Sequence, residues 1–397
     1  MCYNIGRTRE QFPVKKILRG IFIMRNYDVM AWYFPNWPPD RRNDEWHGKG
    51  WTEWEVTKCA RPRFEGHDQP KIPVWGYADE SDPNVMELKI RTAKEYGIDG
   101  FIFDTYWFED GGYRLNALEK GFLGAKNNKD FRFALMWCNH DSIYAHPATR
   151  RRPNDPLTSG ELSEEGFIRG SDYFLKNFFT RENYYRVDGK LWFAIWMPEK
   201  LAKGLGGVEN ARRVLDGFRD RVRAAGLGEL YLAAPMHNVP GAWSGDREKA
   251  DGYLKALGFD GTACYSTPTD GKDFPRESFG KYIDDAVGFM DRMDSLSTLP
   301  FSPTMPNGWD SSPRTLQSEI YENVGYPWSV VTVDRSVSEF ERGLRAMKEF
   351  AERPGFRGNM VTLTTWNEWT EGNYLEPDTK FGYGFLEAVR RVFGTKN

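Results

Sequence analysis

Two glutamates near the C-terminus, Glu368 and Glu371, have the spacing of a catalytic acid/base pair. They stand in the segment 364–377, TTWNEWTEGNYLEP, which follows an apolar run. On a straight strand two such residues would point to opposite faces, but on a turn, which Gly372 favours, they can face the same way. Paired carboxyls are what cleavage of a glycosidic bond requires, since one protonates the leaving oxygen while the other acts on the sugar side. The same segment supplies an aromatic wall that would keep one carboxyl protonated: Trp366, Trp369 and Tyr374.

Simpler interpretations of these acids compete with the chemical one. A Glu-x-x-Glu pair is most often a solvated helix face, so the spacing alone does not favour catalysis. Its position directly after an apolar run, among tryptophans, does favour it. Glu376, which precedes Pro377, is interpreted as a loop or capping residue.

Short apolar runs rich in β-forming residues recur along the chain and predict eight strands. Most are continuously apolar, which is typical of parallel strands buried on both faces. The predicted strands are 28–35, 98–108, 131–139, 190–198, 228–238, 258–266, 300–310 and 359–369. Helical patterns between them predict helices at 82–97, 209–226, 336–355 and 382–394, with weaker ones at 113–126, 161–179, 246–257 and 275–293.

This alternation predicts a single (β/α)8 TIM barrel, with an open doubly wound sheet as the competing architecture. We expect residues 28–397 to form one catalytic barrel and residues 1–27 to be an N-terminal extension, with Met24 a candidate for the biological start. The segment 36–81 lacks periodicity and follows the first strand. It is therefore predicted to be a long loop on the C-terminal face, where barrel enzymes place their active sites.

Polar and aromatic side chains gather where the predicted strands end, and this asymmetry predicts the substrate site. His140 and His237 could each be a hydrogen-bonded rim residue or a catalytic one, and Asp104 is an acid in an otherwise apolar run. The predicted substrate-binding residues are Tyr33, Trp46, Glu53, Trp54, Asp104, Tyr106, Trp107, Trp137, Asn139, His140, Trp196, His237, Tyr265, Trp309, Trp366, Asn367, Trp369 and Tyr374.

Composition narrows the partners. The net charge of −3 offers no basic excess for a nucleic acid, whereas 15% aromatic residues suit the apolar faces of sugar rings. The four cysteines are far apart, and the histidines form no H-E-x-x-H motif, so we expect neither a metal site nor a cofactor. No apolar run reaches membrane-spanning length, and the N-terminus lacks a continuous signal-peptide core. A cytoplasmic location is weakly favoured, with a periplasmic one open if the start is misassigned; nothing indicates the oligomeric state.

Three segments of the sequence resemble the WbsX-like family, whose members are described as glycoside hydrolase family 99-like proteins. They are 31–54, 93–108 and 366–377, and the likeness extends over about residues 28 to 393. The resemblance implies a (β/α)8 barrel and a retaining, metal-independent cleavage. It places the family's E-W-x-E-G motif on residues 368–372, and it implies an unusual route: Glu368 takes the proton of the sugar 2-OH to form a 1,2-anhydro sugar, while Glu371 protonates the leaving oxygen and then activates water.

The chain departs from that pattern at two positions. Thr370 stands where family 99 enzymes carry a histidine, which puts the mannoside specificity in question. Asp104 stands where many WbsX-like relatives show an aromatic residue.

We therefore predict a retaining glycoside hydrolase acting on an α-linked polysaccharide or oligosaccharide, with a mannoside-like sugar included. The alternative is a glycosyltransferase or transglycosylase in surface polysaccharide biosynthesis, against which the chain contains no D-x-D motif. A non-catalytic carbohydrate-binding barrel is the third hypothesis.

Overall fold

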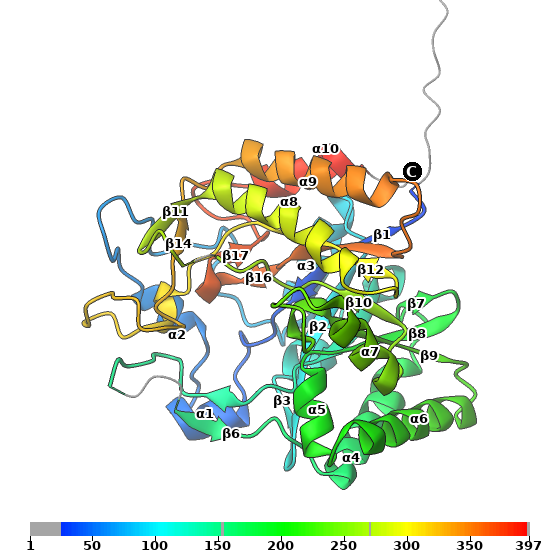
Figure 1. Ribbon diagram of the computed structural model, residues 1–397. Helices are drawn as coiled ribbons and strands as arrows, with labels where there is room; N and C mark the ends of the chain where they lie inside the picture. The colour runs from blue at the N-terminus through cyan, green and yellow to red at the C-terminus, as the bar shows by residue number, and fades with distance from the viewer. Residues whose placement is uncertain (1–24, 152–154, 270, 395–397) are drawn as a thin grey trace, which may run out of the picture.

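Nine parallel strands form the central sheet of the protein (Figure 1). The computed structural model describes residues 25–151, 155–269 and 271–394. Along the sheet the strand order is β12-β10-β9-β8-β4-β2-β1-β15-β13. In chain order the strands are β1 (Asp28–Tyr33), β2 (Gly100–Phe108), β4 (Arg132–Trp137), β8 (Lys190–Ile195), β9 (Leu230–Pro235), β10 (Gly261–Ala263), β12 (Phe301–Ser302), β13 (Thr304–Pro306) and β15 (Met360–Thr364).

The two ends of this sheet meet at Pro303, and the sheet thereby becomes a nearly closed barrel. β12 pairs with β10, whereas β13, which begins one residue after Pro303, pairs with β15. Side-chain hydroxyls add to the closure: Thr362 Oγ1 lies 3.1 Å from the Pro303 carbonyl and 3.4 Å from that of Cys264, and Thr364 Oγ1 donates to the carbonyl of Tyr265, just after β10. The predicted TIM barrel is confirmed, and each predicted apolar run contains a strand. The seventh run contributes two short strands because proline has no N–H to continue the ladder.

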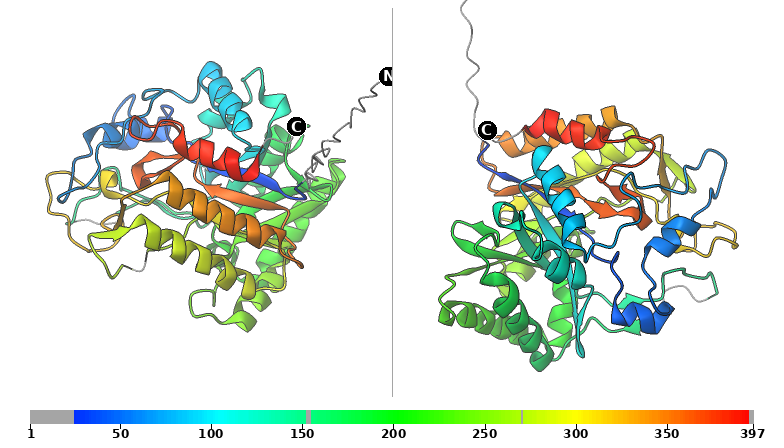
Figure 2. Two further views of the ribbon diagram at one scale, coloured as in Figure 1. Left: turned by 90° about the horizontal axis from the view of Figure 1, so that it is seen from above. Right: turned by 180° about the vertical axis from the view of Figure 1, so that it is seen from behind.

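Helices cover the outside of the barrel. Helices α8, α9 and α10 lie side by side against one flank, as both views of Figure 2 show. Asp and Ser side chains cap the N-termini of several helices, and Asp82 and Ser336 are among these caps. The covering helices are α3 (Pro83–Glu95), α4 (Glu164–Phe174), α5 (Pro198–Gly204), α6 (Val208–Ala224), α7 (Arg247–Leu257), α8 (Phe279–Ser295), α9 (Val337–Glu352) and α10 (Gly384–Phe393).

Alternate residues of each strand belong to two separate apolar clusters. On β1, Val29, Ala31 and Tyr33 pack in the cluster that includes the helices, while Met30 and Trp32 pack in a smaller cluster inside the barrel. Successive side chains of a strand point to opposite faces, so this division follows from the two-residue period.

Shorter elements complete the fold. The predicted helix 113–126 is represented by one wide helical turn, η1 (Ala117–Phe122), and 161–179 continues beyond α4 into η3 (Leu175–Phe179). The other short pieces are β3 (Gly111–Tyr113), β5 (Ser142–Ile143), β6 (Pro156–Thr158), β7 (Arg186–Val187), β11 (Arg276–Ser278), β14 (Val331–Val333), β16 (Asn367–Glu368), β17 (Asn373–Tyr374), η2 (Asn128–Asp130), η4 (Met236–Asn238), η5 (Ser312–Arg314) and η6 (Trp369–Glu371).

The long loop after β1 contains two short helices, α1 (Arg41–His47) and α2 (Trp54–Cys59). The proposed start at Met24 and most of the expected extension 1–27 fall outside the described residues. Within the described part of the chain, every helix is too short or too polar to cross a bilayer.

Candidate active site

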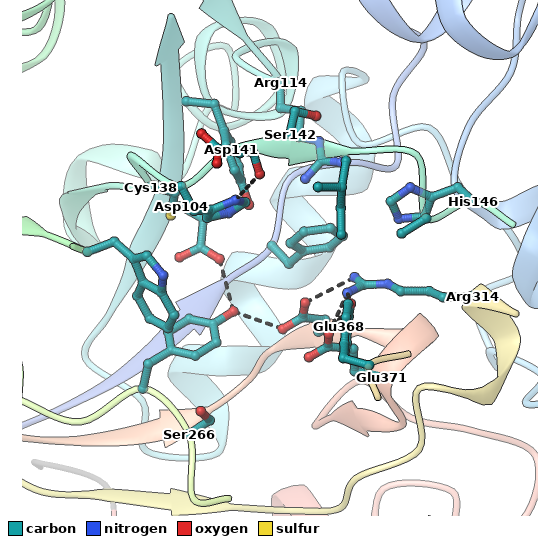
Figure 3. Close-up of a pocket in the computed structure, with 18 of the residues that line it drawn as sticks. Asp104, Arg114, Cys138, Asp141, Ser142, His146, Ser266, Arg314, Glu368 and Glu371 are labelled. Carbon is teal, nitrogen blue, oxygen red and sulfur yellow. Dashed lines mark hydrogen bonds and ion pairs between the residues drawn. The ribbon is translucent and has the colours of Figure 1, made fainter. Parts of the chain in front are cut away.

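Glu368 and Glu371 lie at the two ends of a tight turn in the segment that leaves the barrel after β15. Glu368 ends β16, Glu371 ends the 3-10 turn η6, and Gly372 follows in the left-handed conformation with φ 62°. A Cβ at Gly372 would lie 2.7 Å from the Cβ of Asp310, so only glycine fits this position. The predicted turn is present, and both carboxyls reach one cavity (Figure 3).

This cavity has a volume of about 290 Å³ and lies at the C-terminal ends of the barrel strands. Aromatic rings form much of its wall, from Phe34, Tyr106, Trp196, Tyr265 and Trp309. Its charged and titratable lining comes from Asp104, Arg114, His140, Asp141, His146, Arg314, Glu368 and Glu371. An apolar wall with a few convergent polar groups is typical of a small-molecule site.

A buried arginine holds the two glutamates together. Arg314, at the end of η5, places Nη2 3.1 Å from Glu368 Oε1 and donates from Nη1 to Glu371 Oε1. The hydroxyl of Tyr326 donates to the same oxygen of Glu371 at 2.9 Å. A planar guanidinium can satisfy two carboxylates at fixed angles, so Arg314 sets the relative positions of the pair.

On the other side, Glu368 is linked to a third buried acid through a tyrosine. The hydroxyl of Tyr265 lies 2.8 Å from Glu368 Oε2 and 2.9 Å from Asp104 Oδ2. A phenol has one hydrogen, so it donates to one carboxyl and accepts from the other, which must then be protonated. The site therefore stores a proton between Asp104 and Glu368.

The surroundings of both acids are consistent with a stored proton. Burial raises the pKa of Asp104 well above its usual range, although the hydrogen bond from Tyr265 opposes the rise. Burial also raises the pKa of Glu368 well above its usual range, and the charge of Glu371 adds to this against the influence of Arg314. Like charges that share a buried site cannot all ionise readily.

Behind the cavity wall, Glu53 fixes the arginine from its other side. It is fully buried, does not line the cavity, and accepts from Arg314 Nε at 3.1 Å, from Asn36 Nδ2 at 2.6 Å, and from the Thr370 hydroxyl. His146 Nε2 lies 3.2 Å from Glu53 Oε1. Burial alone would raise the pKa of Glu53, but His146 and Arg314 outweigh it and hold the pKa well below its usual range.

The structure brings part of the predicted site together. Besides the two glutamates, the predicted residues that line the cavity are Asp104, Tyr106, His140, Trp196, Tyr265 and Trp309. His140 Nδ1 lies 2.7 Å from the Asp141 carbonyl and therefore donates to it, which leaves Nε2 as the acceptor of the neutral ring.

The other predicted substrate-binding residues do not line this cavity. Tyr33 and Trp137 pack in the outer core, because the parity of their strands points them toward the helices; Trp366, between β15 and β16, packs in the same core. Trp369 stacks on Tyr374 with ring centroids 3.7 Å apart. The remaining ones outside the lining are Trp46, packed on Tyr113; Glu53; Trp54, packed on Trp37; Trp107, packed on Tyr173; Asn139, bonded to Met197; His237, packed on Trp196; and Asn367, bonded to Phe34.

Glu376 also has a structural partner. It lies in a loop as expected, but it is buried, 2.5 Å from the ammonium of Lys89, and accepts from Trp369 Nε1 at 2.8 Å. The Lys89 ammonium also pairs with Glu80. This ion cluster supports the segment that carries the candidate catalytic pair.

The site residues that sequence reasoning missed come from loops. Arg114, His146, Arg314 and Tyr326 lie outside the barrel strands and far from the glutamates in sequence, and Arg114 falls in the predicted helical segment 113–126. Two closely spaced buried acids do require a nearby cation, which is the one signal that could have directed attention to the arginines. Among the described residues, no group of three or more His, Cys, Asp or Glu side chains is placed to hold a metal ion.

Comparison with known proteins identifies the family. A family model described as Glycosyltransferase WbsX matches residues 29–389. The chain belongs to the WbsX family. Among curated proteins it is 28% identical over 382 residues to the uncharacterized protein WxcX of two strains of Xanthomonas campestris pv. campestris. The match covers 92% of this chain and 49% of WxcX, so the chain spans about half the length of the curated relatives it matches.

Solved structures share the fold of this WbsX-family chain. A glycoside hydrolase-like protein superimposes with a TM-score of 0.59 at 17% identity, covering 98% of this chain and 97% of that one. The GH99 endo-alpha-mannosidase of Bacteroides thetaiotaomicron gives a TM-score of 0.53 at 13% identity, covering 93% and 96%. Both likenesses concern the barrel fold, and the resemblance to family 99-like proteins is confirmed at that level.

Proposed function

We propose that this WbsX-family chain is a retaining glycoside hydrolase that uses Glu368 and Glu371. The observation that carries the proposal is the convergence of both carboxyls on one aromatic-walled cavity at the C-terminal end of a barrel. Barrel enzymes place their reacting groups at that end. The proposed substrate is an α-linked polysaccharide or oligosaccharide, and the structural neighbour whose name is endo-alpha-mannosidase makes a mannoside the first sugar to test.

Glu368 is assigned the sugar side of the reaction. A carboxylate with a raised pKa is a stronger base, which suits it to take the proton of the 2-OH as O2 attacks C1 and a 1,2-anhydro sugar forms. With Glu368 ionised, the stored proton lies on Asp104, which donates to the Tyr265 hydroxyl, and that hydroxyl donates to Glu368. When water later opens the three-membered ring, the proton returns to O2.

Glu371 is assigned the leaving-group side. It gives its proton to the departing oxygen as the bond to C1 breaks, and it then takes a proton from the attacking water. Arg314 and Tyr326 both donate to the carboxylate that this transfer creates. Preorganised donors aimed at a developing charge stabilise the transition state without reorganisation.

The test begins with release of reducing ends from a panel of plant, microbial and host polysaccharides. On an unactivated substrate found in this way, Glu371→Gln should reduce kcat by more than about a hundredfold, because a general acid contributes roughly 10²–10⁴. The matched control is Glu165→Gln on α4, whose side chain is exposed and should leave kcat unchanged. Full activity of Glu371→Gln would remove the assignment.

A glycosyltransferase or transglycosylase is the second candidate, and the description of the family model favours it. Transfer of a sugar to an added acceptor would then outrun hydrolysis, or calorimetry would detect binding of a sugar nucleotide. Hydrolysis that is unaffected by acceptors, with no nucleotide binding, would exclude this candidate.

A further inference from the structure

A second arginine reaches the cavity and has a different environment from Arg314. Arg114 follows β3, and its backbone adopts φ 58°, a conformation that side-chain-bearing residues rarely take. The backbone N–H donates to Asp40 Oδ2 at 3.1 Å, which helps to hold this conformation. Figure 3 shows Arg114 across the cavity from Glu371. Backbone conformations of this kind are rare for residues with side chains and are concentrated at functional sites.

The guanidinium of Arg114 is surrounded by aromatic rings, and the charges of Glu53 and Asp104 act on it only from beyond ion-pair distance. Its central carbon lies 5.0 Å from the ring centre of Phe34, 4.8 Å from that of Tyr106 and 4.6 Å from that of Tyr113. Arg114 is only 8% exposed, and its Nε has no hydrogen-bond partner. Within the described residues it forms no ion pair with a carboxylate.

The acids of the cavity wall are engaged elsewhere. Asp141 pairs with Lys200 at 2.7 Å, and Asp104 contacts the Tyr265 hydroxyl. The catalytic pair is held by Arg314, as described above. The protein therefore gives Arg314 three carboxylates in direct contact, whereas Arg114 has the Tyr113 hydroxyl, the aromatic rings and only the more distant charge of Glu53.

A buried cation without an acid is unfavourable unless something compensates for lost hydration. Cation–π contacts compensate in part, and they also fix the plane of the guanidinium. A rigid guanidinium that borders a cavity and lacks a protein acid is suited to bind an oxyanion, because its fork matches carboxylate and sulfate geometry. A fully neutral sugar would leave this charge without a partner.

We propose that Arg114 binds an anionic substituent of the substrate, a hexuronate carboxylate or a sulfate ester, so that the substrate class is an acidic glycan. This inference rests on the proposed function in one respect, namely that the cavity receives a sugar. It adds a specificity residue on the side of the cavity away from the acid pair.

Binding of monosaccharide probes to the full chain tests the proposal without turnover. Calorimetry would compare glucuronate, galacturonate and glucose 6-sulfate with glucose and with the methyl ester of glucuronate. We expect at least one acidic probe to bind about tenfold or more tightly than its neutral counterpart, from a charge-assisted hydrogen bond. Preference for the uronates or for the sulfate identifies the anion. Equal affinities of acidic and neutral probes would overturn the proposal.

Three variants assign the effect to Arg114. Arg114→Met keeps an apolar stem and should abolish the preference, Arg114→Lys should retain part of it, and Arg345→Met, which removes an exposed charge on α9, should leave it intact. A preference that survives in folded Arg114→Met would refute the assignment. If Arg114→Met does not fold, the comparison of glucuronate with its methyl ester in the wild type still tests whether the cavity prefers an anionic sugar.

The two proposals can fail separately. Full activity of Glu371→Gln together with an Arg114-dependent preference for acidic probes would refute the hydrolase assignment alone. Loss of activity in Glu371→Gln with equal binding of acidic and neutral probes would refute only the inference about Arg114.

Discussion

Replacing Arg314 with methionine should destabilise the protein strongly and in a pH-dependent manner. Arg314 is buried and contacts Glu53, Glu368 and Glu371, so its removal leaves three buried carboxyls without their shared cation. Breaking a buried pair by removing one partner costs about 3–5 kcal/mol. We expect the free energy of unfolding of Arg314→Met to be lower than that of the wild type by this amount at pH 7.5.

The pH dependence follows from linkage. In the wild type, the pKa of Glu53 is depressed, so its contribution to stability is present above its unfolded pKa and is lost only as pH falls through the lower folded pKa. The pKa of Glu368 is already raised in the wild type, and in Arg314→Met we expect a second freed carboxyl to have a pKa above its unfolded value. That carboxyl binds its proton in the folded state, so the stability of the variant rises as pH falls, by about 1.4 kcal/mol per pH unit. The difference in free energy of unfolding between the wild type and Arg314→Met should decrease by roughly 3 kcal/mol between pH 7.5 and pH 5.5.

Urea unfolding followed by tryptophan fluorescence at both pH values measures these quantities. Arg345→Met removes an exposed arginine from an i,i+4 pair on α9 and should cost no more than about 0.5 kcal/mol at either pH. The double variant Glu53→Gln/Arg314→Met should recover part of the loss, because it leaves one unpaired buried charge fewer. Arg314 would not have the proposed role if the free energy of unfolding of Arg314→Met were within about 1 kcal/mol of the wild-type value at pH 7.5. The same conclusion would follow if the difference between the two proteins did not decrease on acidification.

Two further changes test the site. Tyr265→Phe removes a hydrogen bond that lowers the pKa of Glu368, so the acidic limb of the kcat/KM profile should move about one pH unit upward or more; an unmoved limb would exclude Glu368 as the titrating base. Gly372→Ala should lower the free energy of unfolding by at least about 1 kcal/mol, because φ is 62° and the new Cβ would meet Asp310. Gly252→Ala on α7, where a Cβ has open space, is the control and should be neutral or stabilising; equal stability of both variants in thermal unfolding would contradict this account.

The barrel could be predicted because its strands are buried on both faces, which requires continuous apolar runs that a sequence displays directly. The predicted strand 300–310 forms two strands, β12 and β13, on either side of Pro303. β12 pairs with β10, whereas β13 pairs with β15. That pairing is a property of the closed barrel, and no local pattern encodes it.

The acid pair could also be predicted, since Glu368, Glu371 and the glycine after them are contiguous in the sequence. Several tryptophans were placed wrongly for a physical reason. Trp366 follows a strand end, but it packs on Phe101 in the layer between strands and helices, because residue type does not report the face that a residue occupies. The cation that holds the acids, Arg314, comes from a loop whose conformation is determined by tertiary contacts.

The seam of the barrel at Pro303 is secured by side chains as much as by backbone. Hydroxyls of Thr362 and Thr364 reach the carbonyls of Cys264 and Tyr265, where two short strands leave the ladder incomplete. Valine has the same shape as threonine but cannot form these links. Valine at both positions would remove these hydrogen bonds beside Tyr265, whose phenol contacts Glu368. Two hydroxyls on a strand that does not line the cavity thus help to hold the wall of the candidate site in place.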